Sequence, residues 1–224
     1  MPLIAFDTLY DIAAGRKNGA EAFEATLQGP KSHDELVAIP DDRWLSALSK
    51  AVFQAGFNWK VVESKWPRFE EVFEGFDVGR MSLMSDDDLE RYLKTDGIIR
   101  HGKKIRSICD NAVFLRGLAA EYGSGGRAIA EWPKVDFAGL LWMLKQRASR
   151  LGGTTAMYSL RGLGVDSFVL SRDVVRALIR AGVVDKHPGS KRDLDRVQAA
   201  FNHWHAESGR PLTHISRVLA CSIE

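Results

Sequence analysis

The sequence is poor in the features that mark extracellular and membrane proteins. It has only two cysteines, Cys109 and Cys221, whose wide separation fits neither a disulfide framework nor the paired ligands of a zinc site. No apolar run approaches the ~18 residues of a membrane-spanning helix, and no basic stretch precedes the short apolar patch at the N-terminus, as it would in a targeting signal. We therefore expect a cytoplasmic protein in a reducing compartment, with no membrane partner.

An excess of one charge is also missing. The 224 residues include 31 lysines and arginines and 29 aspartates and glutamates, which gives a formal net charge of +2. So small an excess does not mark a nucleic-acid binder, and any basic surface must come from local clustering. With 45% hydrophobic residues the chain can bury a full core, so we expect residues 1–224 to form a single domain or two packed lobes.

Segments of alternating hydrophobicity, which would indicate β-strands, are nearly absent. Apolar residues recur instead at intervals of three and four, so the sequence predicts an all-α fold. Ser85 and the glycines at 56 and 123 are expected at helix ends, and Pro67 is expected to kink or divide one helix. The predicted helices cover residues 20–27, 40–56, 61–76, 85–93, 103–123, 137–150, 154–161, 171–181, 191–207 and 211–221, and a loop is predicted over 123–136.

A pair of glycines lies in the short connection RLGGTT, residues 150–155. Both can adopt positive φ, and a sharp turn there presents the N–H groups of Gly153, Thr154 and Thr155 at a helix N-terminus. Such donors bind anions, including the phosphates of nucleic acids. Gly-Gly turns are also common between helices with no such role, so the pattern leaves both interpretations open.

Arg147 and Arg150 precede this turn and Arg161 follows it, and the next predicted helix carries a stripe of arginines at every fourth residue, Arg172, Arg176 and Arg180. A spacing of four places side chains on one face of a helix. That face is suited to gripping a nucleic-acid backbone without reading its sequence, although the same spacing is also typical of a solvated surface.

The stretch VFQAGFNWKVVESKW, residues 52–66, mixes aromatic residues with Gln54, Gly56 and Asn58. Aromatic residues at helical spacing usually belong to the core. Alternatively, a tryptophan that follows two amide side chains and a glycine bend can form one wall of a pocket that binds a flat ring. The pattern leaves open whether Phe57 and Trp59 are buried or line a pocket.

Longer blocks resemble the DNA-3-methyladenine glycosylase I family: FQAGFNW (53–59), FEGFDVGRMSLMSDDDLERYL (73–93) and DGIIRHGKKIRSICDNA (96–112). The similarity resumes at GGTTAMYSL (152–160), where the sequence is also similar to the helix-hairpin-helix of the wider DNA glycosylase superfamily. The resemblance implies a two-lobed helical fold around a central cleft, with the hairpin motif over about residues 138–161. It further implies a monomer that acts on double-stranded DNA without a cofactor.

The family's site residues carry over only in part. Trp59 matches the stacking tryptophan, with Gln54 and Asn58 beside it, but Ala51 replaces the base-reading carboxylate of the family. Ser171 lies at the position of the superfamily's catalytic aspartate, so the catalytic residue is unassigned. The family's zinc site is missing, and no metal is expected at the remaining candidates, His203, His205, His214 and Cys221.

The resemblance implies a monofunctional DNA glycosylase of base excision repair that removes alkylated purines such as 3-methyladenine after base flipping. A cationic alkylated base stacks well on an indole and departs without a general acid. No lysine lies at a superfamily position for Schiff-base chemistry, and Lys103 and Lys104 are expected at backbone phosphates or in solvent. DNA contacts are expected from Arg150, Leu151, Gly152, Gly153, Thr154, Thr155, Arg172 and Arg176.

Two other functions remain open. A non-catalytic binder of damaged or structured DNA would keep the hairpin and lose the pocket, as Ala51 and Ser171 suggest. A helical regulatory domain without DNA contacts would place the Gly-Gly turn and the arginine stripe on different faces.

Overall fold

The computed structural model describes residues 3–223. It is 69% helical with no β-strand over these residues, which confirms the all-α prediction. None of the described helices is long and apolar enough to cross a membrane. The elements are α1 (Phe6–Gly15), α2 (Ala20–Glu24), α3 (His33–Val37), α4 (Asp41–Gln54), α5 (Trp59–Val72), η1 (Glu74–Phe76), α6 (Val78–Met81), α7 (Asp86–Lys94), α8 (Gly102–Tyr122), α9 (Gly125–Ala130), η2 (Lys134–Asp136), α10 (Phe137–Arg147), α11 (Thr154–Leu163), α12 (Arg172–Arg180), α13 (Lys191–Ser208) and α14 (Leu212–Cys221).

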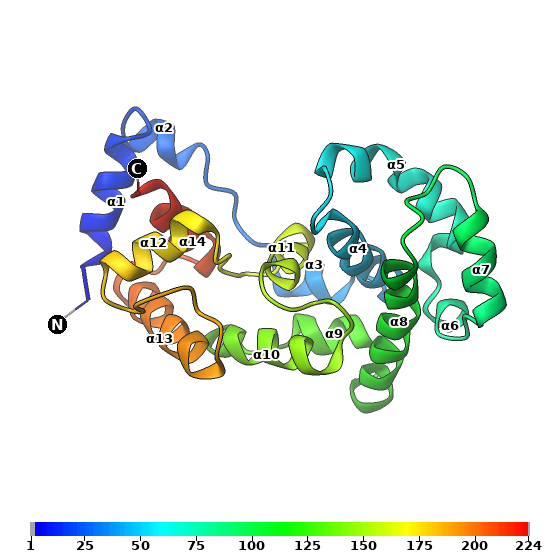
Figure 1. Cartoon of the computed structure of the whole chain (residues 1–224). Helices are drawn as coiled ribbons and strands as arrows, with labels where there is room; N and C mark the ends of the chain where they lie inside the picture. The colour runs from blue at the N-terminus through cyan, green and yellow to red at the C-terminus, as the bar shows by residue number, and fades with distance from the viewer. Residues whose placement is uncertain (1–2, 224) are drawn as a thin grey trace.

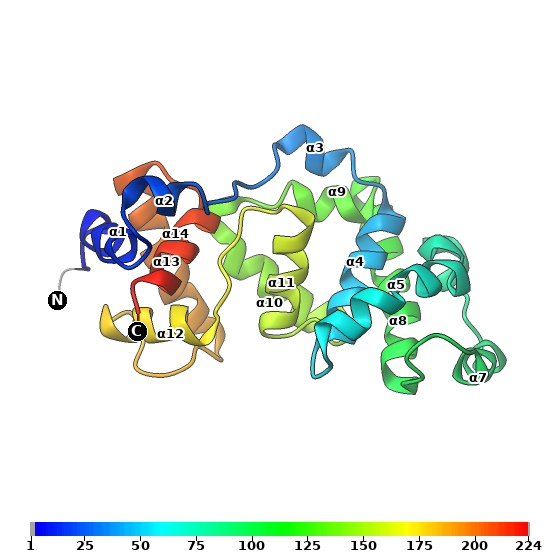
Figure 2. The same cartoon turned by 90° about the horizontal axis from the view of Figure 1, so that it is seen from above.

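The helices form two groups joined by a middle section (Figure 1). One group contains α1, α2, α12, α13 and α14, and the other contains α4 to α8. Seen from above, α11 lies between the two groups (Figure 2). It packs against α4, and α10 packs against both α11 and α13. The N-terminus of α11 is therefore the point at which residues from both groups can meet.

The N-terminal segment belongs to the same group as the C-terminal helices. α1 lies against α13 and α14, Trp204 Nε1 donates a hydrogen bond to the carbonyl of Ile4 at 2.9 Å, and Arg210 forms an ion pair with Glu24. The sequence offered no motif for these residues because the contacts that place them join positions about two hundred residues apart.

Several predicted helix ends agree with the structure. Ser85 caps α7 by accepting a hydrogen bond from the N–H of Asp88, and α8 ends at Gly123, whose φ is 84°. Pro67 does not divide its helix, since α5 runs without a break from Trp59 to Val72. The helices α1, α3 and α6 were not predicted.

The predicted loop over residues 123–136 is wrong, because it contains α9 and a 3-10 turn. Asp41 accepts hydrogen bonds from the N–H groups of Gly125 and Gly126 at 3.0 and 2.8 Å. A Cβ atom at Gly126 would lie 2.1 Å from the Trp44 ring. These glycines thus allow α9 to pack closely on α4 and do not mark a flexible connection.

Candidate functional site

A pocket of about 240 Å³ opens where the end of α4, the start of α5 and the start of α11 meet. It is lined by Ala51, Gln54, Ala55, Gly56, Phe57, Trp59, Thr154, Thr155 and Tyr158. We call it the Trp59 slot. It brings together residues predicted to bind a base and residues predicted to hold DNA, although they are about one hundred positions apart in the sequence.

The local sequence explains how Trp59 comes to face the slot. α4 ends at Gln54, and Gly56 turns the chain with a φ of 77°. Asn58 then caps α5, with its side-chain oxygen accepting a hydrogen bond from the N–H of Lys60 at 3.0 Å. Trp59 is the first residue of α5, and its side chain is 49% exposed. Asn58 itself does not line the slot, because its side chain is used in the cap.

The ring of Tyr158 on α11 faces Trp59 across the slot. The two ring centroids are 5.2 Å apart and the ring planes meet at 89°, an edge-to-face arrangement. Tyr158 is 39% exposed. The slot therefore has two aromatic side chains that are both accessible to a flat ligand.

A buried lysine supports the loop that carries the slot. Lys104 is 3% exposed, and its ammonium donates hydrogen bonds to the carbonyls of Phe53 at 3.1 Å and Ala55 at 2.7 Å. It also lies 4.3 Å from the centre of the Phe57 ring. Burial, and secondarily the charge of Arg150, lowers the pKa of this amine. The expectation that Lys104 reaches phosphates or solvent is wrong, because the end of α4 needs its donors.

The hairpin between α10 and α11 carries the predicted anion site. Gly153 has a φ of 59°, but the other left-handed residue is Arg150, at 61°, and not Gly152. No side chain caps α11, so the N–H groups of its first turn have no side-chain acceptor among residues 3–223. Leu151 is 1% exposed, so its side chain anchors the hairpin and does not face a ligand.

A second cavity, of about 520 Å³, adjoins the slot. We call it the Ser171 groove; it shares Thr154 and Tyr158 with the slot and is also lined by Leu170, Ser171, Arg172, Val175, Arg176 and His187. Ser171 caps α12, and its Oγ accepts a hydrogen bond from the N–H of Val174 at 3.3 Å. The hairpin end and the first two arginines of the stripe therefore lie on one face.

The other arginines near the hairpin are engaged elsewhere. Arg147 pairs with Glu121, and Arg180 donates hydrogen bonds to Ser222. Arg161 is largely buried and bonds to Ser167. Of the stripe on α12, only Arg172 and Arg176 line the Ser171 groove.

Sequence reasoning missed Tyr158 and His187. Tyr158 lies three and four residues after Thr155 and Thr154, so helical spacing alone places it on their face. His187 lies between α12 and α13 and has no comparable sequence signal. No Asp or Glu lines the slot or the groove.

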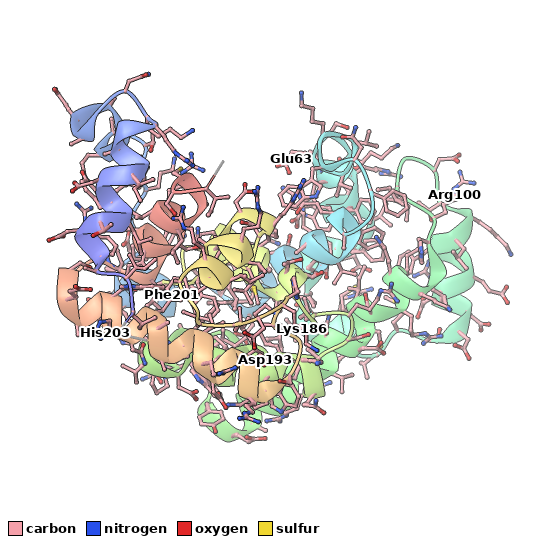
Figure 3. The ribbon with its side chains drawn as sticks, turned by 60° about the vertical axis from the view of Figure 1, so that its left-hand side comes forward. Glu63, Arg100, Lys186, Asp193, Phe201 and His203 are labelled. Carbon is pink, nitrogen blue, oxygen red and sulfur yellow. The ribbon has the colours of Figure 1, made fainter. Side chains whose placement is uncertain are left out.

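The described residues contain no group of three or more His, Cys, Asp or Glu side chains able to hold a metal ion. On α13, Phe201 is fully buried against Phe168, whereas His203, two residues on, is exposed and faces Glu207 (Figure 3). Residues two apart on a helix point in nearly opposite directions.

Known proteins with a similar sequence match the part of the chain that forms the α4–α5 side of the slot. Residues 31–136 match the model of the methyladenine glycosylase family. Over 92 residues the chain is 39% identical to DNA-3-methyladenine glycosylase 1 of Escherichia coli K12. The aligned region covers 36% of this chain and 49% of that protein. Residues 31–136 are thus similar to the methyladenine glycosylase family. The matched segment carries the α4–α5 side of the slot, whereas Tyr158 and the Ser171 groove lie beyond it.

Solved structures extend the likeness to the remainder of the fold. The 3-methyladenine DNA glycosylase I of Staphylococcus aureus has a TM-score of 0.52 at 20% identity, covering 70% of this chain and 91% of that one. The Methanocaldococcus jannaschii 8-oxoguanine glycosylase/lyase, solved with a 15mer DNA containing 8-oxoguanine, has a TM-score of 0.55 at 16% identity, covering 95% of both chains. At these identities the likeness shows a shared fold, and it confirms the predicted all-α, glycosylase-like fold. The chain spans about half the length of the curated Escherichia coli relative.

Proposed function

We propose that the protein is a monofunctional DNA glycosylase that removes alkylated purines such as 3-methyladenine from double-stranded DNA. The observation that carries the proposal is the Trp59 slot, in which a half-exposed indole lies beside the uncapped start of α11. The match of residues 31–136 to the methyladenine glycosylase family model supports the same chemistry.

The slot suits a single extruded base. The slot has a volume of about 240 Å³ and is lined by the exposed rings of Trp59 and Tyr158, which leaves room for one flat base. Stacking on an aromatic ring stabilises a bound base by about 1–3 kcal/mol, which offsets part of the few kcal/mol needed to unstack it. A positively charged alkylpurine gains further from the electron-rich indole face of Trp59.

The surroundings of the slot suit a DNA backbone. The N–H groups of the first turn of α11 face the end of the hairpin, and Arg172 and Arg176 line the neighbouring groove. Phe57 is 40% exposed at the edge of the slot and is held by Lys104. Its exposure and apolar ring support a role in filling the gap that an extruded base leaves in the stack.

Because no carboxylate lines the slot or the groove, the site is suited to a base that can leave without being protonated. When the N-glycosidic bond of a cationic alkylpurine breaks, the base takes the bonding electron pair and departs neutral, so no acid need protonate it. Water then adds to the sugar and releases a proton. Ser171 and His187 are two of the groove residues able to orient that water. A neutral lesion needs more assistance than these side chains supply.

One observation favours a second function. Because no Asp or Glu lines the slot or the groove, a protein that binds damaged DNA without cutting it would show the same residues. The open slot favours the glycosylase over the binder. A protein that binds DNA without extruding a base has no need of an exposed indole beside the hairpin.

The test is release of free base from methylated duplex DNA by the purified protein and by Trp59→Ala. Tyr122→Ala is the matched control, because Tyr122 is 58% exposed and lies outside both cavities. We expect release by the wild type and the control and a loss of about 5- to 150-fold in Trp59→Ala, equivalent to 1–3 kcal/mol. Equal release by all three proteins contradicts the slot, and tight binding without release by any of them favours the binder.

A further inference from the structure

A separate cavity of about 460 Å³ lies at the other end of α11. Its walls are the connection between α2 and α3 (residues 26–30), the last turn of α11 and the start of α14. Figure 2 shows this connection passing beside α11 on its way from one group of helices to the other. We call the cavity the linker pocket. It shares no residue with the Trp59 slot or the Ser171 groove.

One wall of the linker pocket holds a guanidinium that forms no direct ion pair within the described residues, although the charge of Asp166 acts on it from outside the pocket lining. The side chain of Arg161 donates hydrogen bonds to the hydroxyl of Ser167 at 3.0 Å and to the carbonyl of the same residue. No carboxylate of residues 3–223 forms an ion pair with it, and burial lowers its pKa to about 10. Buried charges are normally paired, because desolvating an unpaired charge is costly.

Two further nitrogen-bearing side chains face the same space from α14. The Nε2 atom of His214 is buried and has no hydrogen-bond partner among residues 3–223. Burial, and secondarily the charge of Arg210, lowers the pKa of this ring, against the opposing influence of Glu24, Asp166 and the carbonyl of Gln28. Arg217 lines the pocket, is exposed, and forms no ion pair or hydrogen bond within the described part of the chain.

The carboxylates that act on these groups, Asp166 on Arg161 and His214 and Glu24 on His214, lie outside the pocket lining. No Asp or Glu lines the pocket, and its other polar side chains are the neutral Thr26, Gln28 and Thr213. Asp166 lies nearby but accepts a hydrogen bond from the N–H of Thr213 at 2.9 Å and lines a different cavity. The cavity thus concentrates positive charge and unused donors around an open space.

We infer that the linker pocket binds a phosphate group, held by Arg161 and Arg217, with the ring of His214 in the pocket wall beside it. Arginine forks match phosphate oxygens in geometry and charge, and about 460 Å³ is within the range of small-ligand sites. The phosphate belongs either to a free nucleotide or to a DNA strand that reaches beyond the hairpin. The inference goes beyond the proposed glycosylase activity, because the pocket is separate from the slot.

The imidazole of His214 gives a direct readout of occupancy. The full-length protein, labelled with 15N at its six histidines, is titrated in separate experiments with inorganic phosphate, deoxyadenosine 5′-monophosphate and undamaged duplex DNA. Loss of one set of ring signals in His214→Gln assigns them. We expect saturable shifts of the His214 signals, with a dissociation constant raised about tenfold in Arg217→Gln.

Arg196→Gln is the matched control, because Arg196 is an exposed arginine on α13 that lines none of the three cavities. We expect it to bind as the wild type does. Arg217 is exposed, so its replacement leaves the fold intact even if a variant of the buried Arg161 does not fold. Shifts with phosphate and nucleotide assign the site to a free ligand, and shifts with DNA alone assign it to the DNA backbone.

Absence of any His214 shift with all three probes overturns the inference, as does equal affinity in Arg217→Gln and the wild type. The measurement does not depend on base release. A protein that binds phosphate at His214 but releases no base would lose the proposed glycosylase function and keep the linker pocket.

Discussion

The indole of Trp59 and the phenol ring of Tyr158 meet edge to face across the slot, with centroids 5.2 Å apart and ring planes at 89°. Trp59 begins α5 and Tyr158 lies on α11, so the pair connects the family segment to the hairpin region beyond it. An edge-to-face pair leaves a ring face open, and a bound base can stack there.

Removing the Tyr158 ring should weaken base capture. Aromatic pairs contribute about 0.5–1.5 kcal/mol beyond area burial, so we expect Tyr158→Ala to slow base release by about two- to tenfold in single-turnover assays. Tyr158→Phe keeps the ring and should release base at the wild-type rate. A Tyr158→Ala protein as fast as the wild type would show that Trp59 acts without this partner.

Restoring a carboxylate at position 171 should widen the range of bases removed. Both Asp and Asn cap helices as well as serine does, so Ser171→Asp and Ser171→Asn should keep α12 in place and differ in charge alone. We expect Ser171→Asp to release hypoxanthine, a neutral purine, from DNA faster than Ser171→Asn does. Equal rates for the two variants would mean that position 171 does not reach the reacting sugar.

The two groove arginines should control how salt affects DNA binding. Each phosphate contact contributes about −0.9 to the slope of log affinity against log salt concentration. Arg172→Gln and Arg176→Gln should each reduce the size of that slope by about 0.9, measured by fluorescence anisotropy with an undamaged duplex. Arg196→Gln should leave the slope unchanged, and a slope unchanged in the groove variants as well would place DNA on another face.

Lys104 should be needed for the shape of the slot, and its neighbour Lys103 should not. Lys104→Met removes the donors to the carbonyls of Phe53 and Ala55, so we expect lower base release and a lower free energy of unfolding. Lys103→Met is the control, since Lys103 is exposed. If the two variants behave alike in urea unfolding and base release, the buried ammonium does not hold the loop.

The same lysine gives a pH signature. Its pKa is lowered in the folded state, mainly by burial, so between that value and the ordinary value of about 10.4 the unfolded chain binds more protons. In this alkaline window the unfolding free energy of the wild type should rise with pH relative to that of Lys104→Met. A parallel pH dependence in both proteins would contradict a depressed pKa.

The sequence predicted most helices because their signals are local. Ser85, Gly123 and the three- and four-residue spacing of apolar side chains act within one helix. The failures involve distant contacts: α9 is stabilised by Asp41 and by the close approach of Trp44, neither of which is visible in the sequence around Gly125.

The residues of the candidate site likewise fall into those that local sequence predicts and those that only distant contacts place. A family motif marks Trp59, and glycines mark the hairpin, so both were predicted. The motif did not reveal that Asn58 caps α5 or that Lys104 lies under the loop. His187 and the linker pocket depend on how α12, α14 and the 26–30 connection come together, which only the folded chain shows.

The central claim is that the Trp59 slot receives one alkylated purine, and binding of the free base measures this most directly. We predict that isothermal titration with 3-methyladenine gives one saturable site in the wild type and in Tyr122→Ala. In Trp59→Ala the affinity should fall by about 5- to 150-fold. Equal affinity in Trp59→Ala and the wild type, or no binding to the wild type, would contradict the account.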